Sequence, residues 1–220
     1  MIAGPVGWKL APEGAAIHAG ERTAVVADVH LGNEWSRGSG GDQVPAHSLA
    51  ETLAKLGALL GRAKIERLVV AGDLTETAAP CVRTLRDVRR LADWLAGRGV
   101  ALIPLMGNHD MPRRPPLPAT IEVDGWTIGH GHRPIAGPRI IFGHHHPALK
   151  ADGLAAPCFV VGPAAIALPA FSPNAAGLDI RAFELPEIFT GGSPRCIAGL
   201  GAELLDFGPL EALRTRLGGR

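Results

Sequence analysis

Aspartate, histidine and asparagine side chains gather in five short segments of this sequence. Such side chains bind divalent metal ions, and imidazole mixed with carboxylate and amide oxygens is typical of transition-metal centres. A glycine precedes the polar residues in four of the five segments, as expected where the backbone turns sharply or a ligand approaches closely. Each motif alone is common, but together they predict a metal centre. The segments are Asp28-Val29-His30, Gly72-Asp73, Gly107-Asn108-His109-Asp110, Gly129-His130 and Gly143-His144-His145-His146.

An apolar run precedes each of these segments, and each run has the character of a buried strand. The runs are Thr23 to Ala27, Arg67 to Ala71, Val100 to Met106, Trp126 to Ile128 and Arg139 to Phe142. In α/β sheets, ligands collect outside the carboxyl ends of the strands. We therefore expect the first metal-binding residue of each segment to lie at one sheet edge. These residues are Asp28, Asp73, Asn108, His130 and His144.

The remaining periodicity predicts helices around these strands. Leucines recur on one face after Pro45, and a second helix follows from about Pro80 and ends at Gly97 or Gly99. Asp124-Gly125 predicts a hairpin, Cys158 to Phe171 predicts two buried strands joined by a turn, and Pro209 to Leu217 predicts a short closing helix. The inward residues of the two long helices are predicted to be Leu49, Leu53, Leu56, Leu60, Val82, Leu85, Val88, Leu91 and Leu95.

The expected fold is thus α/β. It is a four-layer-type α/β/β/α sandwich with mixed central sheets, helices outside and the metal site at the carboxyl ends of the strands. The length of 220 residues fits a single domain over residues 1–220.

The composition excludes several classes of protein. Hydrophobic residues make up 46% and charged residues 20% of the chain, which is the balance of a globular protein. The net charge of +1 predicts no global field for nucleic acid or membranes. Cys81, Cys158 and Cys196 are an odd set with no repeated spacing, which argues against a disulfide framework. Met1 to Gly20 lacks the pattern of a signal peptide, so a cytoplasmic location is expected.

The five segments resemble the calcineurin-like metallophosphoesterase superfamily, whose pattern D-x-H, G-D, G-N-H-D/E, H and G-H-x-H occurs here in that order from Asp28 to His146. Further residues are similar to a narrower branch, the small bacterial and archaeal phosphoesterases related to DNA-ligase-associated phosphodiesterases and to SbcD-type repair nucleases. These residues are Ala27 to Gly32, Gly143 to Pro147, Leu168 to Phe171 and Gly177.

Two metal ions would suit phosphate-ester chemistry because they neutralise the charge that repels a nucleophile and lower the pKa of a bound water. Asp73 is the natural bridging carboxylate. Asp28, His30 and His146 would complete the first site, and the resemblance implies Asn108, His130 and His144 for the second. This ligand set suits manganese best, with iron, zinc or cobalt as alternatives to it, rather than magnesium or calcium.

His109 is the histidine of these motifs that we expect to act as a general acid. Its neighbour Asn108 takes a metal, so the imidazole can face the leaving group and supply a proton near neutral pH. We expect Asp110 to hold the orientation of the His109 ring and to favour its charged form. The resemblance implies the same role for this pair.

Other polar residues receive weaker assignments. Arginine binds phosphate oxygens in a bidentate manner, so the loop residues Arg37, Arg113, Arg114 and Arg133 are candidate substrate contacts, although most loop arginines only carry solubilising charge. For His132 and His145 a position away from substrate is favoured. His18 and His47 are expected at the surface, and Trp35 is expected to anchor a glycine-rich loop over Gly32 to Gly41.

The favoured function is a phosphodiesterase for small nucleotide-like or other diesters. Between His109 and His130 the chain has only the proline-rich segment Met111 to Pro118 and one hairpin, too little for a capping domain. The alternatives are a DNA nuclease, a phosphomonoesterase or pyrophosphatase for a small metabolite, and a scaffold that has lost the chemistry. The expected partners are a small phosphoester substrate and, through the branch resemblance, DNA repair proteins. No membrane partner is expected, and the oligomeric state stays open.

Overall fold

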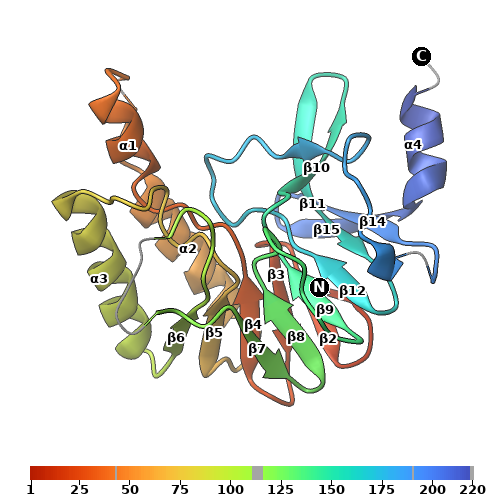
Figure 1. Cartoon of the computed structure of the whole chain (residues 1–220), viewed down its shortest axis with the longest axis horizontal. Helices are drawn as coiled ribbons and strands as arrows, with labels where there is room; N and C mark the ends of the chain where they lie inside the picture. The colour runs from red at the N-terminus through yellow and green to blue at the C-terminus, as the bar shows by residue number, and fades with distance from the viewer. Residues whose placement is uncertain (43, 111–115, 190, 219–220) are drawn as a thin grey trace.

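The computed structural model describes residues 1–42, 44–110, 116–189 and 191–218. Two mixed β-sheets stand side by side, with α1 to α3 next to one sheet and α4 next to the other (Figure 1). This arrangement confirms the predicted α/β fold with two mixed central sheets and outer helices. No helix within the described ranges is long and apolar enough to cross a membrane.

Among the described residues, the first sheet has six strands in the order β1-β2-β3-β4-β5-β6. Its first three pairings are antiparallel, whereas β4-β5 and β5-β6 are parallel. Helix α2 leads from β4 towards β5, and α3 connects β5 to β6. The strands are β1 (Ile2–Ala3), β2 (Trp8–Ala11), β3 (Ala15–His18), β4 (Thr23–Val26), β5 (Arg67–Val70) and β6 (Ala101–Pro104).

In the part of the chain that the structure describes, the second sheet has nine strands, with the order β13-β10-β11-β12-β9-β8-β7, and β14 and β15 continue from β11. The pairings of β12 with β9 and of β9 with β8 are parallel. Its strands are β7 (Thr120–Val123), β8 (Trp126–Gly129), β9 (Ile140–Phe142), β10 (Pro147–Ala151), β11 (Leu154–Val161), β12 (Ala165–Ala167), β13 (Leu178–Asp179), β14 (Arg195–Leu200) and β15 (Glu203–Pro209). The hairpin at Asp124-Gly125 and the two strands between Cys158 and Phe171 are confirmed.

Alternation along the strands gives each sheet two apolar faces. Val25 and Val69 point into a core shared by both sheets, where they meet residues such as Trp126 and Phe159. Their neighbours, for example Val26 and Val70, pack beneath α2 and α3. A third core lies beneath α4 on the second sheet. Because the strands are buried on both faces, they read as continuous apolar runs in the sequence.

The helices are α1 (Asn33–Ser39), α2 (Ser48–Leu60), α3 (Val82–Ala96) and α4 (Leu210–Gly218), and a 3₁₀ turn covers Glu187–Phe189. The closing helix is confirmed at α4. Two of the predicted inward residues are wrong, because Val82 and Leu85 are 73% and 42% exposed. The buried face of α3 runs through Thr84, Asp87, Leu91 and Leu95 instead.

Helix α1 occupies the segment that the glycines Gly32 to Gly41 predicted to be a loop, so that prediction is wrong. Tertiary contacts stabilise this short helix. Trp35 Nε1 donates to Asp87 on α3 at 3.0 Å, and the buried Glu34 accepts a hydrogen bond from Ser48 on α2 at 2.5 Å. Trp35 is therefore an anchor, as expected, but on a helix.

Candidate metal centre

The parallel strands of both sheets direct the predicted site residues to one region. Asp28, Asp73 and Asn108 follow β4, β5 and β6 of the first sheet, while His130 and His144 follow β8 and β9 of the second. A parallel bridge between Ala27 and Ala170 links the chain just before Asp28 to the segment that follows β12. The strand ends of two sheets, rather than of one, therefore supply the site.

Five of the seven predicted metal ligands have a left-handed backbone. Their φ angles are 57° for Asp28, 51° for His30, 51° for Asp73, 68° for His144 and 47° for His146. This conformation costs roughly 1 kcal/mol or more for a residue with a side chain, although Asp and His adopt it more readily than most. Such strain gathers at functional sites, where the surrounding structure maintains it.

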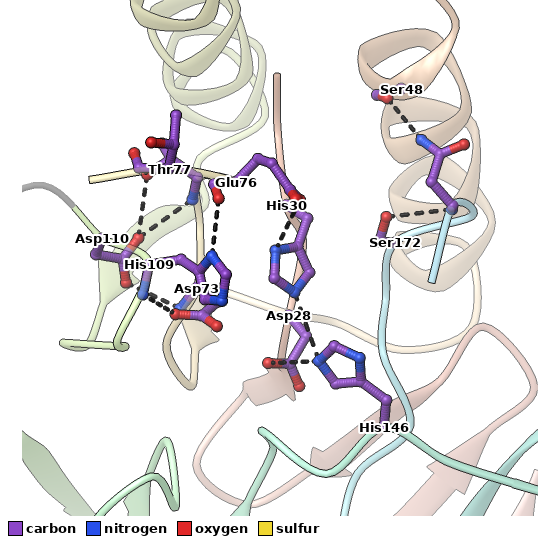
Figure 2. A network of polar contacts seen from close by, with 12 residues as sticks. Asp28, His30, Ser48, Asp73, Glu76, Thr77, His109, Asp110, His146 and Ser172 are labelled. Atoms are coloured by element: carbon purple, nitrogen blue, oxygen red, sulfur yellow. Dashed lines mark hydrogen bonds and ion pairs between the residues drawn. The ribbon is translucent and has the colours of Figure 1, made fainter. Parts of the chain in front are cut away.

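Asp28, His30 and His146 form one group with ligand atoms within 4.8 Å of one another. The Nε2 atom of His146 is 3.2 Å from Asp28 Oδ1 and 3.5 Å from His30 Nε2 (Figure 2). Asp28 is fully buried, and its Oδ1 has no hydrogen-bond partner among the described residues. A buried carboxylate oxygen without a donor is costly, and a cation between these three side chains would remove that cost.

Asp73, Asn108 and His130 lie together in a second group. The Nε2 atom of His130 is 2.9 Å from Asn108 Oδ1 and 3.2 Å from Asp73 Oδ2, and its Nδ1 is 3.0 Å from the carbonyl oxygen of Ala71. The carbonyl can only accept, so Nδ1 carries the proton and a neutral ring turns its Nε2 lone pair towards two further acceptors. A positive charge would satisfy these three atoms, either as a second proton on the His130 ring or as a metal ion.

His144 completes this side of the site. Its ring centroid is 5.0 Å from that of His130, and its backbone N–H donates to Asp28 Oδ2 at 2.9 Å. Burial, together with the positive charge of His130, lowers the pKa of His144 to about 4. The ring is therefore neutral at physiological pH, which is the form that binds metal ions.

The charged groups of the protein at this site favour positive charge. Burial opposes charging of His130, but its hydrogen bond to Asp73 and the negative charges of Asp28 and Asp73 outweigh that effect and raise the pKa of His130. Burial likewise opposes ionisation of Asp73, yet the contact with His130 lowers the pKa of Asp73 below its usual value. The residues present therefore fit divalent metal ions in both geometry and charge.

His109 lies beside the first group, with its ring centroid 5.4 Å from that of His30. Its backbone N–H donates to Asp73 Oδ1 at 2.9 Å, and its Nδ1 is 2.8 Å from the backbone oxygen of Glu76 (Figure 2). The expectation that Asp110 orients this ring is wrong. The Asp110 carboxylate accepts the backbone N–H groups of Asp73 at 2.8 Å, Gly107 at 2.9 Å and Thr75 at 3.1 Å.

Glu76 is a site residue that the motifs did not reveal. Its Oε2 is 3.1 Å from His30 Nδ1, and Glu76 forms a group with His30 and His109 whose ligand atoms lie within 4.8 Å of one another. The one available signal is its position three residues after Asp73, in the turn that leaves β5.

The weaker assignments have mixed outcomes. Arg37 is exposed and pairs with Asp42 at 2.9 Å. Arg133 is exposed just beyond His132. Arg113 and Arg114 lie outside the described residues, as does most of the segment Met111 to Pro118. All the substrate contacts therefore stay predictions. His132 lies beside the site, with its ring 5.2 Å from that of His130.

Three further histidines lie away from the centre. His145 packs edge-on against Phe142 and Phe183, which agrees with its predicted position away from substrate. His47 is exposed, as expected. The surface assignment of His18 is wrong, because it is 7% exposed and its Nε2 is 2.9 Å from Asp124 Oδ2.

Comparisons with known proteins bear on this geometry. The family model described as calcineurin-like phosphoesterase matches residues 21–156. The crystal structure of the nuclease MPE from Pseudomonas putida is similar over 93% of this chain and 98% of that chain, with a TM-score of 0.70 and 22% sequence identity. At that identity the likeness concerns the fold alone. A comparison with curated proteins gave no match.

Proposed function

The chain belongs to the calcineurin-like phosphoesterase family, and from that membership we propose that it is a phosphodiesterase that uses two metal ions to hydrolyse small nucleotide-like diesters. The family and the buried groups of histidine and aspartate make it a metal-dependent phosphoester hydrolase. The observation that carries the proposal is the environment of His130 Nε2, which faces Asp73 Oδ2 at 3.2 Å and Asn108 Oδ1 at 2.9 Å.

We assign the ligands of each ion as follows. The ligand atoms of Asp73 lie within 4.8 Å of those of Asp28, from the first group, and of His130, from the second, so Asp73 would contact both ions. The first ion would be held by Asp28, His30 and His146, and the second by Asn108, His130 and His144. We infer manganese as the metal because four imidazoles among carboxylate and amide oxygens are a softer set than magnesium or calcium prefer.

When bound, the ions would neutralise the phosphate charge and lower the pKa of a water molecule. The chain itself would supply the proton for the leaving oxygen. His109 is suited to this role because its Nδ1 is 2.8 Å from the carbonyl oxygen of Glu76, which leaves Nε2 to face the substrate and to donate its proton from the doubly protonated ring. Asp110 supports the turn that carries His109 through its contacts with the backbone of Asp73 and Gly107.

A diester rather than a monoester is favoured by the short connection between His109 and His130. In sequence it holds only a proline-rich segment and the β7–β8 hairpin, so a substituent could extend from each side of the phosphorus. The proposal therefore expects no requirement for a terminal phosphate group.

A nuclease is the second candidate, because the similar solved structure is that of a nuclease. The motifs at Ala27 to Gly32 and Gly143 to Pro147 add the resemblance to ligase-associated and SbcD-type enzymes, and with it a link to DNA repair proteins. The net charge of +1 counts against duplex DNA, whose binding relies on many phosphate contacts by Lys and Arg.

The test compares kcat/KM, with manganese added, for bis-nitrophenyl phosphate, nitrophenyl phosphate and labelled single-stranded and duplex DNA. We expect the diester to be preferred and the duplex to remain uncut at physiological salt. Asp73→Asn serves as the control, because it should abolish activity and reduce bound metal at both sites. A preference for the monoester would point to a phosphatase, and efficient cleavage of DNA would establish the nuclease instead.

A further inference from the structure

Glu76 lies between a predicted metal ligand and the predicted proton donor. Figure 2 shows the rings of His30 and His109 directed towards it from two sides. The contact to His30 is made by the side chain, with Glu76 Oε2 at 3.1 Å from His30 Nδ1. The contact to His109 is made by the backbone, with the carbonyl oxygen 2.8 Å from His109 Nδ1. One residue thus meets both histidines with different groups.

The backbone around Glu76 is fixed by strand-like pairing with the chain after Asp28. Leu31 N–H donates to the Leu74 carbonyl at 3.0 Å, and Glu76 N–H donates to the Leu31 carbonyl at 3.0 Å. His30 N–H also donates to the Asp73 carbonyl at 3.0 Å. Glu76 therefore cannot shift without disturbing the segment that carries His30.

The carboxylate of Glu76 decides which nitrogen of His30 is free. Its oxygen Oε2 lies 3.1 Å from His30 Nδ1, within reach of a proton on that nitrogen. A carboxylate at this position favours the tautomer of His30 that carries its proton on Nδ1, and in that tautomer Nε2 is unprotonated. Nε2 is the atom that faces His146, at 3.5 Å between the two Nε2 atoms. Such outer partners commonly fix the tautomer of a metal-binding histidine.

The carbonyl of Glu76 acts in a similar way on His109. It can only accept, so it holds the Nδ1 proton of His109 and leaves Nε2 to exchange a proton with substrate. Glu76 contacts the Nδ1 atom of both rings, so it favours the same tautomer in His109 and in His30.

We propose that Glu76 is a positioning residue that orients the metal ligand His30 through its carboxylate and the proton donor His109 through its carbonyl. The proposal rests on the function proposed above. It predicts that removal of the carboxylate weakens metal binding, whereas the carbonyl contact survives any substitution that keeps the backbone in place.

The test measures the manganese affinity and stoichiometry of the intact protein by calorimetry, for the wild type, Glu76→Ala and Glu76→Gln. We expect Glu76→Ala to bind one of its two ions about 10–100-fold more weakly, which is the usual effect of losing such a partner. Glu76→Gln should stay within a few-fold of the wild type, because its amide oxygen can still accept the His30 proton. Saturating manganese should restore most of the activity of Glu76→Ala, since all the ligands remain.

Two controls make the result specific. His109→Gln should retain the metal affinity of the wild type while it slows hydrolysis of esters with poor leaving groups. Glu203→Ala removes an exposed carboxylate at the start of β15 and should change neither quantity. Circular dichroism at the assay temperature checks that each variant is folded.

Two outcomes would overturn the proposal. Unchanged affinity in a folded Glu76→Ala would show that the carboxylate does not orient His30. Equal weakening in Glu76→Gln and Glu76→Ala would identify Glu76 as a direct metal ligand rather than a positioning residue. Because affinity is measured without substrate, the proposed diesterase activity can fail while this test still gives its answer.

Discussion

Asp110 connects three backbone N–H groups through a single carboxylate. Its Oδ2 accepts from Asp73 at 2.8 Å and from Gly107 at 2.9 Å, and its Oδ1 accepts from Thr75 at 3.1 Å. Burial, with a smaller effect from the charge of Asp73, raises the pKa of Asp110. Asp110 therefore links the turn after β5 to the turn after β6. It affects the site by fixing the backbone of these two turns.

This arrangement predicts the effect of Asp110→Asn. An asparagine offers one oxygen in place of two, so at least one buried N–H group loses its acceptor. We expect the free energy of unfolding to fall by about 1–3 kcal/mol, measured by urea denaturation in the absence of metal. The control Asp42→Asn, in an exposed pair with Arg37, should change stability by less than about 0.5 kcal/mol. If Asp110→Asn kept full stability and impaired only hydrolysis of poor leaving groups, the ring-orienting role would be restored.

Single residues also mark the limit of what the sequence predicts at the site. The predicted ligands were found from their order after apolar runs, and the structure brings them together. Glu76 could not be found in this way, because its contact with His30 depends on the pairing of the segment after Asp28 with the segment after Asp73. The partner of the His109 ring was also missed, because a backbone carbonyl leaves no trace in residue types.

At the scale of elements, the strand ends approach one another so closely that no Cβ atom fits between them. A Cβ atom added to Gly143 would lie 2.4 Å from Ala27 Cβ and 2.5 Å from Asp28 Oδ2. At Gly107 it would lie 2.1 Å from Asp73 Oδ1. These glycines let the loops after β9 and β6 contact the predicted ligands that follow β4 and β5.

Gly143→Ala should therefore displace Asp28 and disturb both the fold and the centre. We expect the free energy of unfolding to fall by about 1–3 kcal/mol, as for other overpacked sites, and manganese affinity to fall with it. Gly57→Ala is the matched control, because its Cβ atom meets nothing within 4 Å and it lies inside α2. That variant should gain roughly 0.5–1 kcal/mol. Tight manganese binding by Gly143→Ala would show that the strand ends can separate without loss of the site.

The elements also differ in how well their sequences predicted them. The parallel strands β4 and β5 are buried on both faces, so their apolar runs stand out. The first three strands were not predicted, because β1 has only two residues and the alternation of β2 and β3 is hidden by alanines and a buried histidine. The inner face of α3 was misassigned because one of its buried positions is the polar residue Asp87, where periodicity predicts an apolar one. Asp87 is buried there because it accepts a hydrogen bond from the indole N–H of Trp35.

The whole molecule depends on contacts between its two sheets that sequence periodicity does not encode. Trp8 and Trp126 meet edge to face at 6.3 Å in the shared core, and His18 reaches from β3 to Asp124 in the β7–β8 turn. Both contacts join segments more than one hundred residues apart. Apolar runs predict that strands exist, but the choice of partner strand depends on the packing of all of them together.

Lys55 is another long-range link, and it makes stability depend on pH. Its ammonium group donates to the Phe171 carbonyl at 2.6 Å and lies 4.2 Å from the centre of the Phe171 ring. Burial lowers the pKa of Lys55 to about 8, against a smaller opposing effect of Glu13 and Glu51. In the unfolded chain this lysine would titrate near its ordinary value of about 10.4. Between these two values the unfolded chain binds more protons than the folded one, so the free energy of unfolding rises as the pH rises.

The expected rise from Lys55 between pH 8 and pH 10.5 is at most about 3 kcal/mol, and Lys55→Met should remove it. Urea denaturation of both proteins at several pH values measures the difference. The chain has no tyrosine, which keeps this range free of phenol titration. The raised pKa of the buried Cys158 thiol lowers the free energy of unfolding as the pH rises, because the unfolded chain loses the thiol proton first. This effect is the same in the wild type and in Lys55→Met. Parallel curves for the wild type and Lys55→Met would mean that the ammonium group is as well solvated in the folded protein as in the unfolded chain.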